Sequence, residues 1–90
     1  DINASIATDP YNAWAYRNKG IYYLMKQDAA NALRLLEQAI EMDAYIENGY
    51  VYLAQGYVLS GDQSESCKAA QKAFSLKQMD ETAVKRYCKN

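Results

Sequence analysis

The chain has 90 residues, half of them hydrophobic, and a formal net charge of −1. That length suits one domain at most, and the apolar share is enough for a core. A near-neutral charge argues against a nucleic-acid partner, because such binding depends on a basic surface. The sequence contains no histidine, which removes the commonest general base and metal ligand. We therefore expect no enzyme, no cofactor and no metal site.

The first predicted elements are helical. Residues 2–8 are predicted to end a helix that Asp9-Pro10 breaks, because the residue before a proline avoids the helical region. Asn12 is placed to cap a new helix that runs to about residue 25. No stretch reaches the ~18 apolar residues of a membrane span, and no signal-peptide pattern opens the chain. We expect no membrane span, and the compartment stays open.

A second and a third helix follow at short intervals. Asp28 is predicted to cap a helix that continues to about residue 42. Residues 43–46 form the next connection, and a further helix covers about residues 47–59. All of these elements are helices, so the sequence predicts an all-α fold.

The last two predicted helices start after turns. Gly61 suits the left-handed position past a helix end. Asp62, followed by Glu65 three residues on, resembles a capping box at the start of a helix that reaches about residue 76. Residues 79–89 are predicted to form a final helix.

The chain repeats itself. Several pairs of identical residues are 34 positions apart, namely Tyr11 and Tyr45, Tyr16 and Tyr50, Tyr23 and Tyr57, Asp28 and Asp62, and Ala39 and Ala73. A fixed period in the range of about 20–50 residues is typical of solenoid proteins. Small residues recur where paired helices must touch, at Gly20 or Ala54, Ala32 or Ser66, and Ala39 or Ala73. Such residues allow two helices to approach closely.

The motif order is specific. Tyr16-x2-Lys19-Gly20-x2-Tyr23, then Ala32-x3-Leu36 and Ala39, resembles a tetratricopeptide repeat. A second copy reads Tyr50-x2-Leu53-Ala54-x2-Tyr57, then Ser66-x3-Ala70 and Ala73, and Pro10 matches the closing proline of an earlier unit. The resemblance implies an α-solenoid of antiparallel helix pairs in a right-handed superhelix of period 34. The single domain 1–90 would comprise the end of a preceding repeat (1–10), two repeats (13–46 and 47–80) and a terminal helix (81–90).

The resemblance also implies a binding groove. In such stacks the first helix of each pair lines a concave surface. The expected groove residues are Trp14, Arg17, Ile21, Leu24, Asn48, Val51, Tyr52, Gln55, Lys85 and Arg86. They form an apolar and aromatic floor with cations near each end, and tryptophan, tyrosine and arginine dominate binding energy at interfaces. The alternative for Trp14 is a structural role against a preceding helix.

Some members of the family clamp the terminal carboxylate of a peptide with basic and asparagine residues. Arg17 and Arg86 match part of that pattern. Ile21 and Tyr52 stand where the clamp needs asparagine, and Thr82 where it needs lysine. The clamp is incomplete, so an apolar or aromatic segment, extended or helical, fits the groove better.

The two cysteines allow two interpretations. In the family's layout, the helices that carry Cys67 and Cys88 are antiparallel neighbours, which makes a disulfide geometrically possible. The alternative is a pair of reduced, buried thiols. A bridge would imply an oxidising, extracytoplasmic compartment.

The expected function is a protein-interaction scaffold that binds a peptide segment of a partner in the groove. The alternative is a self-assembly module that forms homo-oligomers. It rests on the uneven charge, which is −4 over residues 1–62 and +3 over residues 63–90. A helical repeat that reads RNA would need basic inner helices, and this face is mostly apolar.

Overall fold

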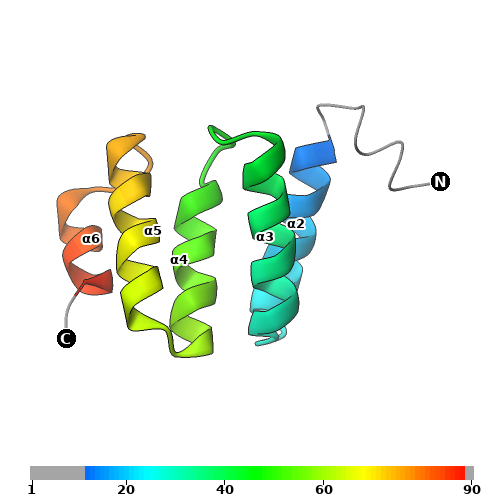
Figure 1. Ribbon diagram of the computed structural model, residues 1–90, viewed down its shortest axis with the longest axis horizontal. Coiled ribbons are helices and arrows are strands. Elements are labelled where there is room, and N and C mark those ends of the chain that lie inside the picture. Colours follow the sequence, from blue (N-terminus) through cyan, green and yellow to red (C-terminus); the bar gives the residue numbers. More distant parts are fainter. Residues whose placement is uncertain (1–11, 89–90) are drawn as a thin grey trace.

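The computed structural model describes residues 12–88 and is all-helical over that range. Its helices are α2 (Asn12–Met25), α3 (Ala29–Met42), α4 (Gly49–Ser60), α5 (Gln63–Ser75) and α6 (Glu81–Tyr87). They stand side by side in one row, and successive helices run in opposite directions (Figure 1). Each helix packs against the next, and α2 also contacts α4. The expected all-α class is confirmed, whereas the expected end of a preceding repeat lies outside the described residues.

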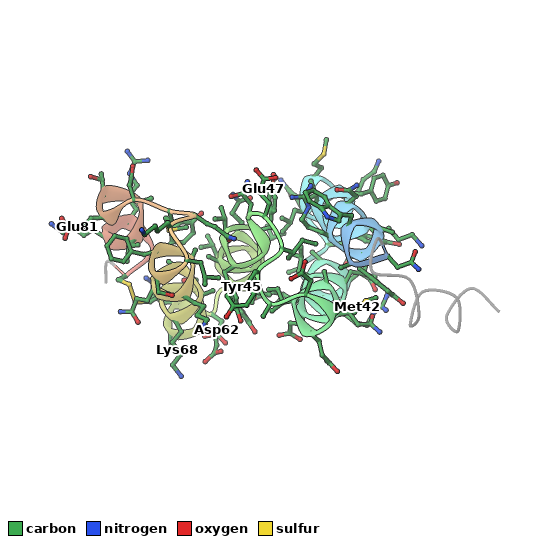
Figure 2. The ribbon with its side chains drawn as sticks, turned by 90° about the horizontal axis from the view of Figure 1, so that it is seen from above. Met42, Tyr45, Glu47, Asp62, Lys68 and Glu81 are labelled. Atoms are coloured by element: carbon green, nitrogen blue, oxygen red, sulfur yellow. A yellow bond between two sulfur atoms is a disulfide. The ribbon has the colours of Figure 1, made fainter. Side chains whose placement is uncertain are left out.

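Seen from above, the row has two sides. The helices α2 and α6 lie toward one side and α3 and α5 toward the other, with α4 between them (Figure 2). The labelled side chain of Glu47 lies on the α2 side, and that of Tyr45 on the α3 side (Figure 2). The α2 side of the row therefore carries α2, α6 and the side chain of Glu47 (Figure 2).

The turn between α2 and α3 and the turn between α4 and α5 have the same hydrogen bonds. The backbone N–H of Asp28 donates to the Tyr23 carbonyl at 2.9 Å, and the N–H of Asp62 donates to the Tyr57 carbonyl at 2.9 Å. Each aspartate also caps the helix that follows, because its carboxylate accepts from the backbone N–H three residues on, at 3.2 Å and 3.1 Å. The predicted caps are thus confirmed, and the two turns are built alike.

The residue before each capping aspartate is left-handed. Gly61 has φ 84°, as its sequence position predicted, and Gln27 has φ 60° at the matching place. A non-glycine residue adopts this region at a cost, whereas glycine does not. The capping box predicted at Asp62 is only half formed. The N–H of Asp62 is used in the turn, and the Glu65 carboxylate pairs with Lys68 at 3.2 Å.

The predicted small residues are buried where the helices meet. They are Gly20, Ala32, Ala39, Ala54, Ser66 and Ala73. At Gly20 there is no room for a side chain, because a Cβ built there would lie 2.6 Å from Cγ of Leu36. Leu36 is itself fully buried in the main core cluster. This cluster is formed by residues of α3, α4 and α5, namely Ala32, Leu36, Leu53, Ala54, Ala69 and Ala70. Close helix contact in this chain therefore depends on the absence of a side chain.

A second cluster joins α2 to α3 and to the connection that follows α3. It contains Ala13, Tyr16, Leu35, Ala39 and Ile46. Ile46 lies between α3 and α4, so the helix predicted from about residue 47 begins later, at Gly49. Asn48 precedes it with φ 60° and makes no side-chain capping bond. A Cβ on Gly49 would lie 2.6 Å from Cγ2 of Ile46, so the chain needs glycine where it passes this side chain.

The last helix is short and lies at the edge of the row. α6 covers Glu81–Tyr87 instead of the predicted residues 79–89, because Asp80 caps it and accepts from the Ala83 N–H at 2.8 Å. A disulfide joins Cys67 of α5 to Cys88 directly after α6, with 4.5 Å between the Cα atoms. Closing a loop of this size removes freedom from the unfolded chain, typically worth about 3 kcal/mol.

Candidate functional site

Three of the predicted groove residues come together on the α2 side. The guanidinium carbon of Arg17 lies 4.0 Å from the centre of the Trp14 ring and 5.8 Å from the centre of the Tyr52 ring. Trp14 and Arg17 are one turn apart on α2, and Tyr52 comes from α4. Stacking of this type is favoured by the negative face of an aromatic ring. We call Trp14, Arg17 and Tyr52 the aromatic–arginine cluster.

Arg17 is held by hydrogen bonds as well as by stacking. Its Nη1 donates to the backbone carbonyl of Glu47 at 2.7 Å, and its Nη2 donates to Oδ1 of Asn18 at 3.3 Å. Its Nε is buried without a hydrogen-bond partner. Glu47 lies between α3 and α4, so Arg17 ties α2 to the start of α4. A guanidinium fixed in this way has few N–H groups left for a ligand carboxylate.

The cluster leaves aromatic surface open to solvent. Trp14 is 38% exposed, and Tyr52 is half-buried. Arg17 contacts the ring of Trp14 at 4.0 Å and is itself hydrogen-bonded, and a preorganised surface of this type costs a ligand less side-chain entropy. The surface therefore suits apolar or aromatic groups better than an isolated anion.

The remaining groove residues of α2 and α4 lie in different environments. Ile21 and Val51 are half-buried, and Gln55 is exposed. Leu24 lies against the main core cluster, and its Cδ2 is 3.6 Å from where a Cβ of Gly56 would be. Leu24 therefore contributes to helix packing. The half-buried Asn48 sits at the left-handed position before α4.

The two predicted cations of the last helix lie far along the row. Lys85 and Arg86 are exposed on α6, and Lys85 pairs loosely with Glu81 at 3.9 Å. α6 packs against α5 and stands at the opposite end of the row from α2 (Figure 1). These cations are separate from the aromatic–arginine cluster, and only an elongated ligand would reach both.

Sequence reasoning missed two features of the cluster. The Glu47 carbonyl is a backbone group, so no residue type could have indicated it. Asn18 was not selected, although it is adjacent to Arg17 and carries an acceptor. Tyr22 is a third missed residue. It is 53% exposed on α2, with the Lys26 ammonium 5.6 Å from its ring centre.

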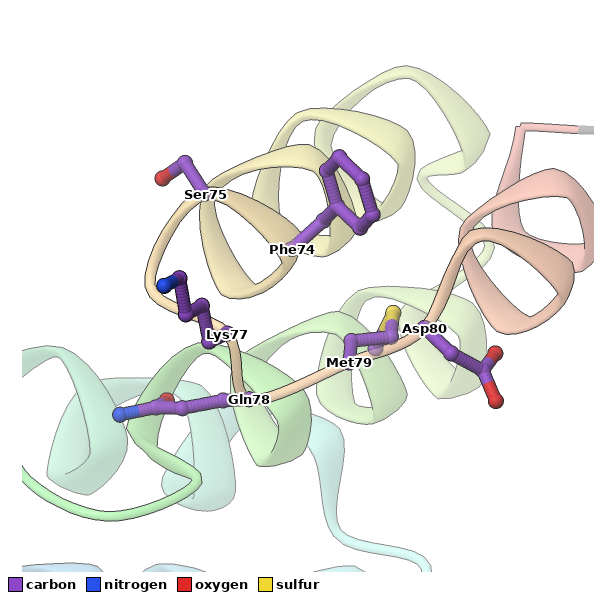
Figure 3. Close-up of a pocket in the computed structure, with 6 residues that line it drawn as sticks. All are labelled: Phe74, Ser75, Lys77, Gln78, Met79 and Asp80. Carbon is purple, nitrogen blue, oxygen red and sulfur yellow. The ribbon is translucent and has the colours of Figure 1, made fainter.

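A shallow hollow lies at the junction of α5 and α6. Its volume is about 660 Å³, and it is lined by Phe74, Ser75, Lys77, Gln78, Met79 and Asp80. Figure 3 shows Phe74 projecting from the end of α5, while Met79 and Asp80 lie on the connection that leads into α6. Lys77 and Asp80 are exposed there, and Gln78 donates through Nε2 to the Ile46 carbonyl at 3.2 Å. No group of residues in this hollow has the pattern of a catalytic site.

Over residues 12–88, no cluster of three or more cysteine, aspartate or glutamate side chains could hold a metal ion. No helix in that part of the chain is long and apolar enough to cross a membrane. Comparison of the chain with models of protein families, with curated proteins and with solved structures found no match. What this protein does must therefore be argued from its own residues.

Proposed function

We propose that this protein is an interaction scaffold of the tetratricopeptide type, in which antiparallel helix pairs repeat with a period of 34 residues in a right-handed superhelix. Two observations support the period. The turns at Asp28 and Asp62 have the same hydrogen bonds and the same left-handed residue. Small residues at matching positions are buried between the helices in both halves. Such stacks bind other chains along a concave surface.

The observation that carries the proposed function is the stacking of Arg17 on Trp14 next to Tyr52. Most globular proteins bury such rings or scatter them, whereas here two helices bring them to one partly exposed site. Exposed tryptophan and tyrosine held in place are typical of binding hot spots. The partner is therefore a protein segment that offers apolar or aromatic side chains.

The fixed position of Arg17 argues against recognition of a terminal carboxylate. Two of its N–H groups are already engaged, and Nε is buried. Only one N–H on each of Nη1 and Nη2 is left for a ligand carboxylate. The disulfide between Cys67 and Cys88 further favours an oxidising compartment for the partner as well as for this chain.

The experiment is a binding assay with short fluorescent peptides of four compositions: aromatic, aliphatic, acidic and basic. The aromatic and aliphatic peptides are expected to bind, and Trp14→Ala is expected to weaken them at least about tenfold, as for a hot-spot residue. The matched control is Tyr45→Ala, which removes an aromatic ring that is 76% exposed on the other side of the row. Equal losses in both variants, or binding of the acidic peptides alone, would contradict the proposal.

Self-association is the second candidate. Its support is the charge asymmetry of −4 over residues 1–62 and +3 over residues 63–90. If opposite charges join the copies, sedimentation at tens of micromolar should show oligomers at low salt that dissociate at high salt, because salt screens such attraction. A monomer under both conditions would reject this candidate.

A further inference from the structure

The helix α6 is held to the rest of the molecule by few contacts. None of its residues is fully buried. Val84 and Tyr87 are half-buried and pack, together with Met79 before the helix, against the core cluster that contains Ala69 and Ala70 of α5. A seven-residue helix is far shorter than the ~12–15 residues at which isolated helices become marginally stable. Its structure therefore depends on staying attached to α5.

Two further links join α6 to α5. The disulfide ties Cys67, in the first half of α5, to Cys88 at the end of α6. The Gln63 side chain donates to the Tyr87 carbonyl. Both links lie at the end of α6 that is far from the connection to α5, so they hold this end of the helix against α5.

The connection between α5 and α6 can act as a hinge. Residues 77–80 line the shallow hollow, and Lys77 and Asp80 are exposed to solvent (Figure 3). Lys77 has φ 61°, a left-handed conformation that is unfavourable for a residue with a side chain. An extended connection would relieve it and could span about 16–18 Å. The backbone N–H groups of Leu76, Lys77 and Gln78 donate to carbonyls in the last turn of α5, so these bonds hold the start of the connection. The Gln78 side chain donates to the Ile46 carbonyl, a bond that must break if the connection extends.

We propose that α6 can be exchanged between two copies of this chain, and that the disulfide determines whether α6 packs on the α5 of its own chain or on that of the other copy. When Cys67–Cys88 is reduced, α6 leaves α5 and uncovers the surface that contains Ala69. The occupant that fits this surface is α6 of a second copy together with the connection before it, because they carry the same Met79, Val84 and Tyr87 that pack against the core cluster within one chain. Reoxidation then joins Cys67 of one copy to Cys88 of the other.

The redox steps balance as thiol–disulfide exchange. A dithiol reductant attacks the disulfide, and its two sulfurs become a cyclic disulfide while the two cysteines take up two protons and two electrons. On reoxidation by glutathione disulfide, one cysteine forms a mixed disulfide and releases one glutathione thiol. The cysteine of the second copy displaces the other glutathione and completes the interchain bond.

Complementary variants test the exchange directly. Cys67→Ser keeps only Cys88, and Cys88→Ser keeps only Cys67, so neither can form the internal bridge. The two are mixed in equal amounts, one of them labelled with ¹⁵N, and oxidised with glutathione disulfide. Intact mass measurement without reductant then separates the mixed dimer from the two like dimers.

If α6 docks on the α5 of another copy, the mixed Cys67–Cys88 dimer should exceed both like dimers together. In random pairing it would equal their sum. A matched control moves the α5 thiol to the exposed far end of the helix, in the triple variant Cys67→Ser, Ser75→Cys, Cys88→Ser. Mixed with Cys67→Ser, this variant should pair at random. A mixed Cys67–Cys88 dimer at or below the random proportion would overturn the proposal.

The wild-type chain gives a second readout that does not depend on the variants folding. A mixture of labelled and unlabelled chains is reduced, reoxidised at rising protein concentration and digested. The share of disulfide-linked Cys67 and Cys88 peptides in which only one of the two peptides is labelled should increase with concentration. A share that stays at zero at every concentration would equally overturn the proposal. Neither readout involves Trp14, so the outcome is independent of the proposed peptide binding.

Discussion

The Tyr57 hydroxyl of α4 donates a 2.6 Å hydrogen bond to Oε2 of Glu37 on α3. This bond joins the two helix pairs, because α3 ends one pair and α4 begins the next. Tyr57 also packs against the main core cluster with its ring. Burial and, after it, the hydrogen bond to Glu37 raise the pKa of Tyr57 well above its usual value of 10.0. One side chain thus links packing, hydrogen bonding and charge at this junction.

Replacement of Tyr57 by phenylalanine should lower the free energy of unfolding by about 1 kcal/mol, the typical worth of one partly exposed hydrogen bond. The pH dependence should also change. Because the folded state keeps the Tyr57 proton, the group's contribution to stability is fully present below about pH 10 and is lost as the pH rises through the raised pKa. Denaturant unfolding at about pH 9 and pH 11 should show that the free energy of unfolding falls less in Tyr57→Phe than in the wild type.

The matched control for this change is Tyr22→Phe, which alters a tyrosine that is 53% exposed. The free energy of unfolding of this variant should fall between the two pH values by the same amount as that of the wild type. If both variants lose stability to the same extent, Tyr57 is not the group responsible.

Two glycines are expected to respond differently to alanine. In Gly20→Ala the new Cβ would lie 2.6 Å from Cγ of the fully buried Leu36. Overpacking of this type costs about 1–3 kcal/mol and outweighs the gain of roughly 1 kcal/mol from better helix propensity. In Gly56→Ala the closest atom is Cδ2 of the half-buried Leu33 at 2.7 Å, the end of a side chain that can move.

Urea unfolding should therefore show a lower free energy of unfolding for Gly20→Ala and a value within about 1 kcal/mol of the wild type for Gly56→Ala. The opposite order would mean that α2 and α3 are not in close contact at Gly20.

Arg17 is predicted to control the environment of Trp14, the only tryptophan of the chain. In Arg17→Ala the ring loses its stacked cation and becomes more exposed, so its fluorescence emission should shift to longer wavelength. Arg17→Lys keeps the charge but not the planar guanidinium, and its emission maximum should lie between those of the wild type and Arg17→Ala. An unchanged emission maximum in Arg17→Ala would mean that Arg17 does not stack on Trp14 in solution.

Reduction of the disulfide should loosen one helix and leave the others in place. Under reducing conditions, amide hydrogens of α6 are expected to exchange as in an unfolded segment, while those of α3 and α4 stay protected. Chemical unfolding should show a loss of up to about 3 kcal/mol. The control is Cys67→Ser with Cys88→Ser, which should match the reduced wild type. Protection of α6 that persists in both would show that its contacts suffice without the disulfide.

The sequence predicted the approximate positions of the helices and the caps of α3 and α5, because these depend on local signals. Asp28 and Asp62 cap their helices as expected, and Gly61 takes the left-handed conformation. The start of α4 was predicted two residues early because Ile46 anchors the connection to the core. Burial of Ile46 is a tertiary effect that no local pattern reports.

The site could be predicted only in part. Selection of Trp14, Arg17 and Tyr52 followed from the groove that the resemblance implies, and the structure brings these three side chains together. That Arg17 is held by the Glu47 carbonyl could not be foreseen, because every residue carries a carbonyl and only the path of the chain brings this one within 2.7 Å. Leu24 belongs to the same predicted groove, yet it lies against the core, since α4 approaches closely at Gly56.

The central claim is that the α2 side of the molecule, around the aromatic–arginine cluster, binds an apolar or aromatic protein segment. Its most direct test is a titration of the ¹⁵N-labelled chain with a short peptide rich in leucine and phenylalanine, followed by NMR. The account predicts that the indole N–H of Trp14 and the backbone amides around Arg17 and Tyr52 shift most, in a saturable manner. Shifts that centre on α5 and α6, or no saturable shift at all, would contradict it.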